Sequence, residues 1–128
     1  MFTPDIAFSS FSVDDLDAAR AFYRDTLGLE VRDNEMGFIE LVPGTGTRVL
    51  VYNKPDHEPA TFTVLNFQVD DVAAAVDDLN GRGVKTKIYG EGDNAPATDD
   101  KGISTEDGPK IAWFRDPAGN VLSVLNAG

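Results

Sequence analysis

Two pairs of adjacent aspartates, Asp14-Asp15 and Asp70-Asp71, could supply a general acid and a general base. Each pair stands where a short alternating apolar stretch ends and a helical pattern begins. An aspartate at that place accepts a hydrogen bond from an unpaired helix N–H, and a second carboxylate in the first turn interacts favourably with the helix dipole. Since capping accounts for both pairs and for their position, we predict that these aspartates cap helices and take no part in catalysis.

The single histidine, His57, and the absence of cysteine restrict the remaining chemistry. Without cysteine the chain has no disulfide, no thiolate metal site and no cysteine nucleophile. His57 lies among charged residues between two prolines, so we predict an exposed connector; a Ser-His-Asp triad or a histidine metal site would need it buried and positioned. Glu40 is a further candidate base, on a strand whose alternation places it either inward or toward solvent.

An internal repeat must position these residues. Residues 8–23 align with residues 64–79 without a gap, and each copy predicts a short strand, an aspartate pair and a helix. The identical positions in the two copies are Phe11/Phe67, Val13/Val69, Asp14/Asp70, Asp15/Asp71, Ala18/Ala74 and Ala19/Ala75.

Apolar residues at three- and four-residue steps predict a first helix that ends before a left-handed Gly28 and a second helix that ends before residues 80–83. Strand-like segments follow each helix, and the last two in each half are joined by turns rich in proline and glycine. The expected strands are 29–31, 37–42 and 48–52 in the first half and 84–89, 110–115 and 121–125 in the second. Each half is thus predicted to be β-α-β-β-β.

Two such modules resemble the vicinal oxygen chelate superfamily, which includes glyoxalase I, extradiol dioxygenases, fosfomycin-resistance proteins and bleomycin-resistance proteins. The resemblance rests on VDDLDAARAFYRDTLGLEV, FQVDDVAAAVDDLNGRGV and IAWFRDPAGNVLSVL. It implies an α+β fold in one domain, residues 1–128, with tandem modules at 1–56 and 61–128. In that fold the two sheets form a partly closed, barrel-like cavity with the helices outside. The resemblance also implies a homodimer.

Enzymes of this superfamily hold a divalent metal through four strand positions, usually His or Gln on the first strand of each module and Glu near the end of each hairpin. The matching positions here are Phe8, the stretch from Val49 to Val51, Val64 and Ser123. A single serine hydroxyl cannot replace several nitrogen and oxygen donors. We therefore predict no metal, no cofactor and no standard glyoxalase or fosfomycin-transferase chemistry, because the metal stabilises the reacting oxyanion in those enzymes.

The resemblance that remains is to the metal-free drug-binding branch, so we predict a protein that binds a cationic or aromatic small molecule without changing it. Alternation turns Phe11, Val13 and their repeat partners toward the helices and the intervening residues toward the cavity. The predicted ligand-binding residues are Phe8, Ser10, Ser12, Tyr52, Val64, Asn66, Gln68, Tyr89, Trp113 and Ser123. Parity alone does not assign Trp113 to the cavity or to the core. Two alternatives remain. One is an enzyme of the superfamily, a lyase, isomerase or dioxygenase-like protein that is metal-independent or unconventionally metallated, and the other is a protein-recognition module.

The balance of 11 basic and 22 acidic residues gives a net charge of −11, which disfavours nucleic acid and anionic membranes as partners. Residues 89–108 carry six acids against Lys101, and we expect either a lid that attracts a cationic ligand or a disordered, solvated loop. No leader and no apolar run of membrane length is present, so the expected location is cytoplasmic.

Overall fold

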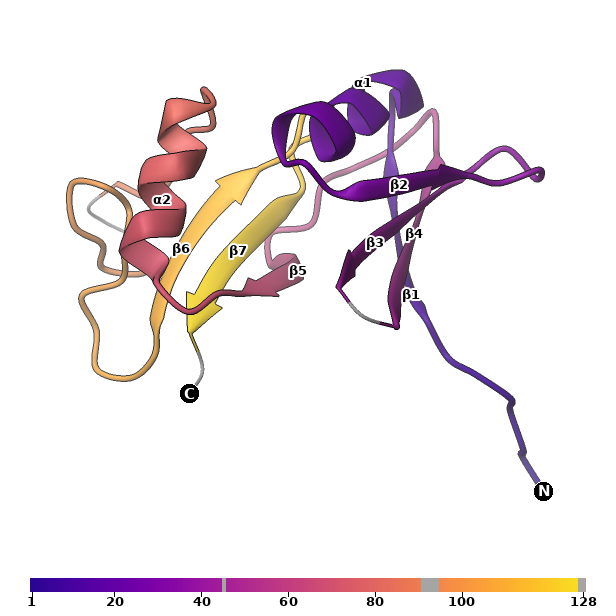
Figure 1. Ribbon diagram of the computed structural model, residues 1–128, viewed down its shortest axis with the longest axis horizontal. Coiled ribbons are helices and arrows are strands. Elements are labelled where there is room, and N and C mark those ends of the chain that lie inside the picture. The colour runs from indigo at the N-terminus through magenta and orange to yellow at the C-terminus, as the bar shows by residue number, and fades with distance from the viewer. Residues whose placement is uncertain (45, 91–94, 127–128) are drawn as a thin grey trace. The chain divides into compact units, whose positions relative to one another are not determined.

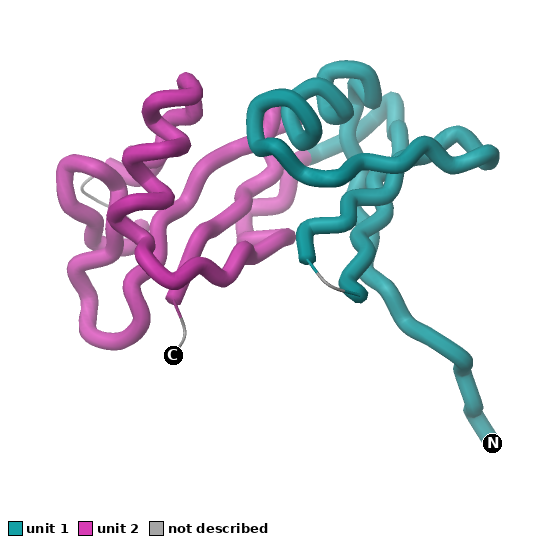
Figure 2. The backbone as a smooth tube through the Cα atoms, viewed as in Figure 1, with its two compact units in different colours: residues 1–58 teal, residues 59–128 magenta. Residues whose placement is uncertain are grey.

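The computed structural model describes residues 1–44, 46–90 and 95–126 (Figure 1). The chain divides into two compact units, residues 1–58 and residues 59–128 (Figure 2). Within the described residues the strands form one four-stranded and one three-stranded sheet, and each unit has one α-helix. The predicted α+β class is confirmed. No closed barrel is formed by the strands that the structure describes, and the tandem modules around a barrel-like cavity stay a prediction.

Unit 1 begins with a strand and a helix and continues as a three-stranded meander. Its elements are β1 (Ser9–Val13), α1 (Leu16–Ala21), the π-helical turn η1 (Phe22–Thr26), β2 (Glu30–Asp33), β3 (Ile39–Gly44) and β4 (Thr47–Asn53). The sheet order is β1-β4-β3-β2, in which β1 runs parallel to β4 and the other pairs are antiparallel. The first half therefore has the predicted β-α-β-β-β order.

Helix α1 starts at a cap that the sequence predicted. The Asp15 carboxylate accepts a hydrogen bond from the Ala18 N–H at 3.0 Å. The helix then widens into η1, where the Leu27 N–H donates to the Phe22 carbonyl, and it ends before Gly28, whose φ of +76° is the left-handed conformation that glycine adopts at little cost. The expected cap and C-terminus are confirmed, whereas the π-helical turn was not predicted.

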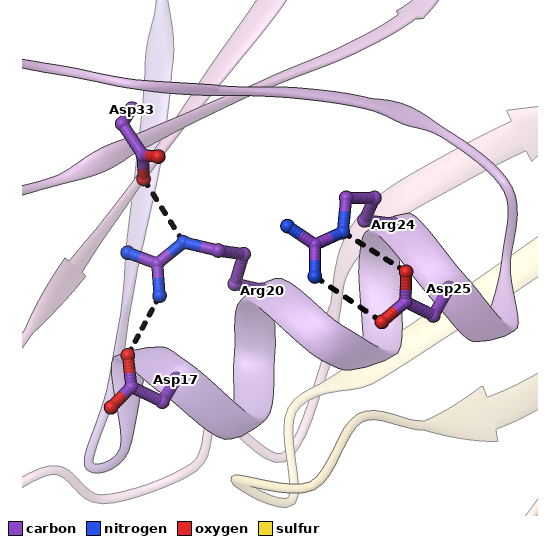
Figure 3. Close-up of polar contacts among 5 residues, drawn as sticks. All are labelled: Asp17, Arg20, Arg24, Asp25 and Asp33. Atoms are coloured by element: carbon purple, nitrogen blue, oxygen red, sulfur yellow. Dashed lines mark hydrogen bonds and ion pairs between the residues drawn. The ribbon is translucent and has the colours of Figure 1, made fainter.

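A single arginine ties α1 to strand β2. Arg20 donates to Asp17 on its own helix at 2.7 Å and to Asp33 on β2 at 2.9 Å, while Arg24 pairs with its neighbour Asp25 at 2.9 Å (Figure 3). The hydrogen bonds that Arg20 donates to Asp17 and Asp33 raise the pKa of Arg20. The Arg24 hydrogen bond lowers the pKa of Asp25. These contacts lie on the surface and hold the helix above the sheet, outside any candidate ligand-binding face.

Unit 2 repeats the strand–helix start, and its sheet has one strand fewer over the residues that the structure describes. Its elements are β5 (Thr63–Gln68), α2 (Val72–Gly81), β6 (Lys110–Arg115) and β7 (Val121–Asn126), and the sheet order is β5-β7-β6 with β5 parallel to β7. Asp71 caps α2 by accepting from the Ala74 N–H at 3.0 Å, as predicted. Helix α2 buries Val72, Val76 and Leu79 and contacts β6 and β7 (Figure 1).

The strand predicted over Val84–Tyr89 is wrong, because these residues are irregular in the structure. Instead of pairing with a strand, this segment forms hydrogen bonds with the end of α2 and with a later loop. The buried Thr86 hydroxyl contacts the Asn80 side chain and the Lys101 carbonyl, at 3.1 and 2.7 Å. Gly102 lies so close that a Cβ there would come within 1.9 Å of the Thr86 carbonyl oxygen. The segment after α2 is therefore fixed against residues 101–102 instead of a sheet edge.

The acidic segment 89–108 contains a hydrogen-bonded turn, over the part that the structure describes, and its role as a lid stays a prediction. Residues 98–104 make a turn in which the Asp99 N–H donates to the Ile103 carbonyl, and the Ser104 N–H donates to the carbonyl of Ile111 on β6. Lys101 also reaches back to Asp77 on α2 at 2.7 Å. The two acids Glu91 and Asp93 lie outside the described residues.

The turn between β6 and β7 has the predicted chemistry. One carboxylate oxygen of Asp116 accepts from the N–H groups of Ala118 and Asn120, at 3.0 and 2.9 Å, and the other accepts from the Asn120 amide. Gly119 has a φ of +85°. This turn sets the register of β6 against β7 and so decides which side chains share a face.

Over the described residues, no helix has the length and apolar character needed to cross a membrane.

Candidate functional site

Three of the predicted ligand-binding residues lie in one row across the sheet of unit 2. Asn66 on β5 is paired with Ser123 on β7, and Ser123 is paired with Trp113 on β6. The Ser123 hydroxyl donates to the Asn66 carbonyl oxygen at 2.5 Å. Because paired residues point to the same side of a sheet, the three side chains lie on one face.

The register also resolves the orientation of Trp113, which alternation left open. The neighbouring residues Ala112 and Phe114 are buried, and the Phe114 ring stacks on Phe67 with centroids 6.4 Å apart. Trp113 therefore points to the face opposite this apolar core. Its ring meets Tyr89 edge-on, with centroids 5.5 Å apart and planes at 76°. Asn66, Trp113 and Tyr89 thus form a small polar and aromatic surface above the fully buried Ser123, and we call this group the Trp113 face.

Unit 1 has a corresponding row in which a carboxylate takes the place of the indole. Ser10 on β1 is paired with Leu50 on β4, and Leu50 is paired with Glu40 on β3. Phe8, Glu40, Arg48 and Leu50 help to line a pocket of about 70 Å³ on this unit. The pocket can hold one small group.

Glu40 supplies a carboxylate to that pocket. Its side chain is 19% exposed, accepts a hydrogen bond from the Asn34 amide at 3.3 Å and lies 3.7 Å from the Arg48 guanidinium. Alternation could not choose between an inward and an exposed Glu40, and the structure places it half-buried in a pocket. Arg48, which neutralises it, was not among the predicted residues; an alternation count along β4 could have found it beside Leu50.

A third group of residues surrounds Ser12 at the end of β1. Ser12 is paired with Tyr52, and its hydroxyl lies 2.6 Å from Nδ1 of His57. The prediction that His57 is an exposed connector is wrong, because the imidazole is half-buried against Ser12. A polar pocket of about 400 Å³ opens here. Its lining residues are Ser12, Tyr52, Lys54, Asp56 and Glu58.

The remaining predicted residues are Val64, Gln68 and Phe8, and of these Phe8 belongs to the Glu40 pocket. Val64 is half-buried near the register shift that separates Thr63 from Leu65 on β5. Gln68, at the end of β5, is exposed. Phe8, which precedes β1, is 59% exposed.

The four superfamily metal positions do not offer a metal site. Register identifies the second position as Leu50, because Leu50 stands opposite Ser10 as Ser123 stands opposite Asn66 in the aligned repeat. Phe8, Leu50 and Val64 have no donor atom, and the Ser123 hydroxyl is already bonded to Asn66. Across the residues that the structure describes, no group of three or more His, Asp or Glu side chains could hold a metal ion. The residues present do not fit the divalent metal of the superfamily enzymes.

The sequence matches the model of the glyoxalase/bleomycin resistance protein/dioxygenase superfamily over residues 6–124. That range takes in both units, and the chain belongs to this superfamily. The resemblance drawn from the aspartate–helix repeats and the Asp116–Asn120 turn is thereby confirmed.

Solved structures of related proteins have the same fold. One is a superfamily member from Sphaerobacter thermophilus DSM 20745, with 25% identity over 94% of this chain and 97% of that chain and a TM-score of 0.66. Another is TnmS3, an antibiotic binding protein from Streptomyces sp. CB03234, with 24% identity over 98% and 100% of the two chains and a TM-score of 0.67. A bleomycin-binding protein in complex with bleomycin has 21% identity over 98% and 100% and a TM-score of 0.66. No curated protein matches the sequence.

Proposed function

We propose that this chain is a metal-free small-molecule-binding protein of the glyoxalase/bleomycin-resistance type, which holds a cationic or aromatic compound without chemical change. Similarity in fold to TnmS3 and to the bleomycin-binding protein supports the class of function. The lack of donor atoms at the superfamily metal positions supports binding over metal-assisted catalysis.

The Trp113 face is the observation that carries this proposal. An indole beside a phenol offers a planar ligand a ring to stack on, and a positive charge over the indole adds attraction. The Asn66 side chain is exposed and uses its carbonyl oxygen for Ser123, so its amide NH₂ group can donate to a ligand acceptor. A net charge of −11 favours the approach of a cationic compound.

Binding can be measured by tryptophan fluorescence, since Trp113 is the only tryptophan. Titration with metal-free bleomycin as a cationic, aromatic probe is expected to quench or shift the emission to saturation. Asn66→Ala is expected to weaken binding by about 1 kcal/mol, or roughly fivefold. It should also lower the thermal midpoint, because the buried Ser123 hydroxyl loses its acceptor, so binding is measured well below the midpoint of the variant. Asn53→Ala, an exposed amide on unit 1, is the matched control. Equal dissociation constants for the two variants would contradict binding at the Trp113 face.

The metal-free state is a separate part of the proposal. Protein purified without chelator is expected to contain far less than one equivalent of any divalent metal. One firmly bound Zn, Ni or Mn per chain would contradict it, and would require a ligand set that the four strand positions do not supply.

A metal-independent enzyme is the second candidate function, and the environment of Glu40 favours it. A carboxylate held beside Phe8 and Leu50 could remove a proton from a carbon acid bound in the small pocket. Incubation with small 2-oxo acids and thioesters, followed by mass spectrometry, tests this function. Turnover that Glu40→Gln abolishes would favour the enzyme, whereas saturable binding with full recovery of the compound would favour the binding protein.

We also propose that the protein is a homodimer, an arrangement common in this superfamily. The exposed apolar side chains ahead of β1, Phe2 at 88%, Ile6 at 67% and Phe8 at 59%, support it because a partner could cover them. Sedimentation velocity at micromolar concentration is expected to give twice the chain mass. A monomer under these conditions would contradict the dimer without affecting the ligand-binding proposal.

A further inference from the structure

The contact between Ser12 and His57 places a base beside a hydroxyl that lines a pocket. The Ser12 Oγ lies 2.6 Å from His57 Nδ1, which is within hydrogen-bond distance. Ser12 also lines the polar pocket of about 400 Å³, together with Tyr52 and Lys54. A hydroxyl that faces a pocket with an imidazole at its side is the arrangement in which a serine can act as a nucleophile.

Backbone hydrogen bonds hold the imidazole in this position. The Lys54 N–H donates to the Val13 carbonyl at 2.8 Å, which anchors the turn after β4 to the end of β1. The His57 N–H donates to the Lys54 carbonyl at 2.9 Å and closes that turn. Since Ser12 precedes Val13 on β1, the same anchor fixes both the hydroxyl and the base.

We propose that Ser12 is an acyl-accepting nucleophile with His57 as its general base, an activity separate from ligand binding at the Trp113 face. In the tautomer protonated on Nε2, the Ser12 hydroxyl donates to Nδ1 and can pass its proton there. Lys54 lines the same pocket, and its hydrogen bond to Asp56 raises the pKa of the Lys54 ammonium, which therefore keeps its charge near neutral pH. A fixed positive charge can stabilise the oxyanion that forms during attack.

The reaction consumes only an ester and water. Ser12 Oγ forms a bond to the carbonyl carbon while its proton moves to His57 Nδ1, and the carbon–oxygen bond to the leaving group breaks as that group takes the proton from His57. Water then attacks the acyl-serine with His57 as base, releases the carboxylic acid and restores the hydroxyl. The carboxylates of Asp56 and Glu58 at the pocket wall repel anionic substrates, so neutral or cationic esters are the class that fits.

Reaction with para-nitrophenyl acetate tests the assignment through the position of the acetyl group and the rate of nitrophenol release. The expected result is acetylation of the peptide that contains Ser12, identified by fragment mass spectrometry, with a burst of nitrophenol. Ser12→Ala removes this acetylation, and His57→Gln slows it about 100-fold. Ser9→Ala, an exposed hydroxyl on the same strand, is the matched control and leaves it unchanged.

Each contrary outcome overturns the proposal. An intact chain that is acetylated only on lysines, or a Ser12→Ala variant that reacts as fast as the parent, would show that the Ser12–His57 contact is structural. Acetyl transfer to His57 itself would make the imidazole the nucleophile. Thermal midpoints of all three variants, measured in parallel, exclude unfolding as the cause of lost reactivity. Bleomycin binding measured on the same variants tests the Trp113 face independently, because Ser12 lies in the other unit.

Discussion

Units 1 and 2 start with the same strand, aspartate cap and helix, and they diverge immediately afterwards. In unit 1 the chain passes through Gly28 into β2, which pairs with β3 and completes a four-stranded sheet. In unit 2 the chain after α2 is held by Thr86 against residues 101–102, and the sheet has three strands. The repeat therefore determines the strand and helix it contains, and the residues that follow it determine how far the sheet extends.

The two units also carry different side chains in an equivalent row of their sheets. The row Ser10–Leu50–Glu40 in unit 1 corresponds to Asn66–Ser123–Trp113 in unit 2, because Ser10 aligns with Asn66 and the strand orders match. A carboxylate thus stands in unit 1 where an indole stands in unit 2. One backbone frame carries an anionic group in one copy and an aromatic group in the other, as expected where chemistry is set by side chains on a common fold.

The largest expected effect comes from emptying the apolar core of each unit at matching positions. Phe114 and Leu41 are 1% and 0% exposed and stand in equivalent rows of their sheets. Phe114→Ala should cost about 3–5 kcal/mol and Leu41→Ala about 2–5 kcal/mol of unfolding free energy. Urea unfolding followed by circular dichroism and by Trp113 fluorescence measures both. A cost below about 1 kcal/mol for Phe114→Ala would contradict the described core of unit 2.

The segment that replaces a strand in unit 2 should be the next most sensitive. Thr86→Val keeps the shape of the buried side chain but leaves the Lys101 carbonyl without its donor, at a cost of about 1–3 kcal/mol. Thr63→Val, at a half-buried position on β5, is the control and should be close to neutral. Equal stability of Thr86→Val and the parent would mean that residues 84–89 are not held by this contact.

The two helix caps should behave alike, because they belong to the shared part of the units. Asp15→Ala and Asp71→Ala each remove one hydrogen bond to a helix N–H and are expected to cost about 1 kcal/mol. The neighbours Asp14 and Asp70 make no cap bond in the structure, so their alanine variants are matched controls. If only one of the two variants lost stability, the two aspartates would not be equivalent, although they align in the repeat.

The smallest effect is expected from surface ion pairs, one in each unit. The Arg24 hydrogen bond lowers the pKa of Asp25, so this pair stabilises the fold above the unfolded-state pKa and is lost as acid protonates Asp25. The Asp77 hydrogen bond raises the pKa of Lys101, so that pair acts below the unfolded-state pKa and is lost as alkali deprotonates Lys101.

Thermal midpoints of Asp25→Asn and Lys101→Gln across the pH range test these opposite signs. The first variant should differ from the parent near neutral pH and converge with it in acid, and the second should converge in alkali. High salt should reduce both differences, because exposed pairs are screened. A difference that is independent of pH and salt would assign the effect to something other than charge.

Local interactions explain why much of the fold could be predicted from the sequence. The Asp15 and Asp71 caps, the left-handed Gly28 and the Asp116–Asn120 turn depend on residues within a few positions of each other. Such interactions leave a pattern in the sequence that alternation and turn chemistry reveal. No such sequence pattern marks residues 84–89 as irregular. Their conformation depends on the contact of Thr86 with Lys101, which is 15 residues further along the chain.

The candidate site was predictable only in its residue types. Alternation proposed Ser12, Asn66 and Trp113, but the face of Trp113 required the register against Ser123. The contact of Ser12 with His57 joins residues 45 positions apart, and a flanking pair of prolines concealed it by suggesting an exposed connector. Long-range pairing of side chains follows from tertiary packing, which a pattern along the chain does not contain.

The parallel pairing of β1 with β4, and of β5 with β7, has a consequence for the order in which the protein folds. Adjacent hairpin strands such as β6 and β7 can pair within microseconds, whereas a parallel partner must wait for the whole intervening chain. During synthesis β1 therefore leaves the ribosome long before β4 exists to receive it. Three of the five residues of β1 are serines. Their polar side chains keep the unpaired strand hydrated and lower its tendency to pair with other strand edges.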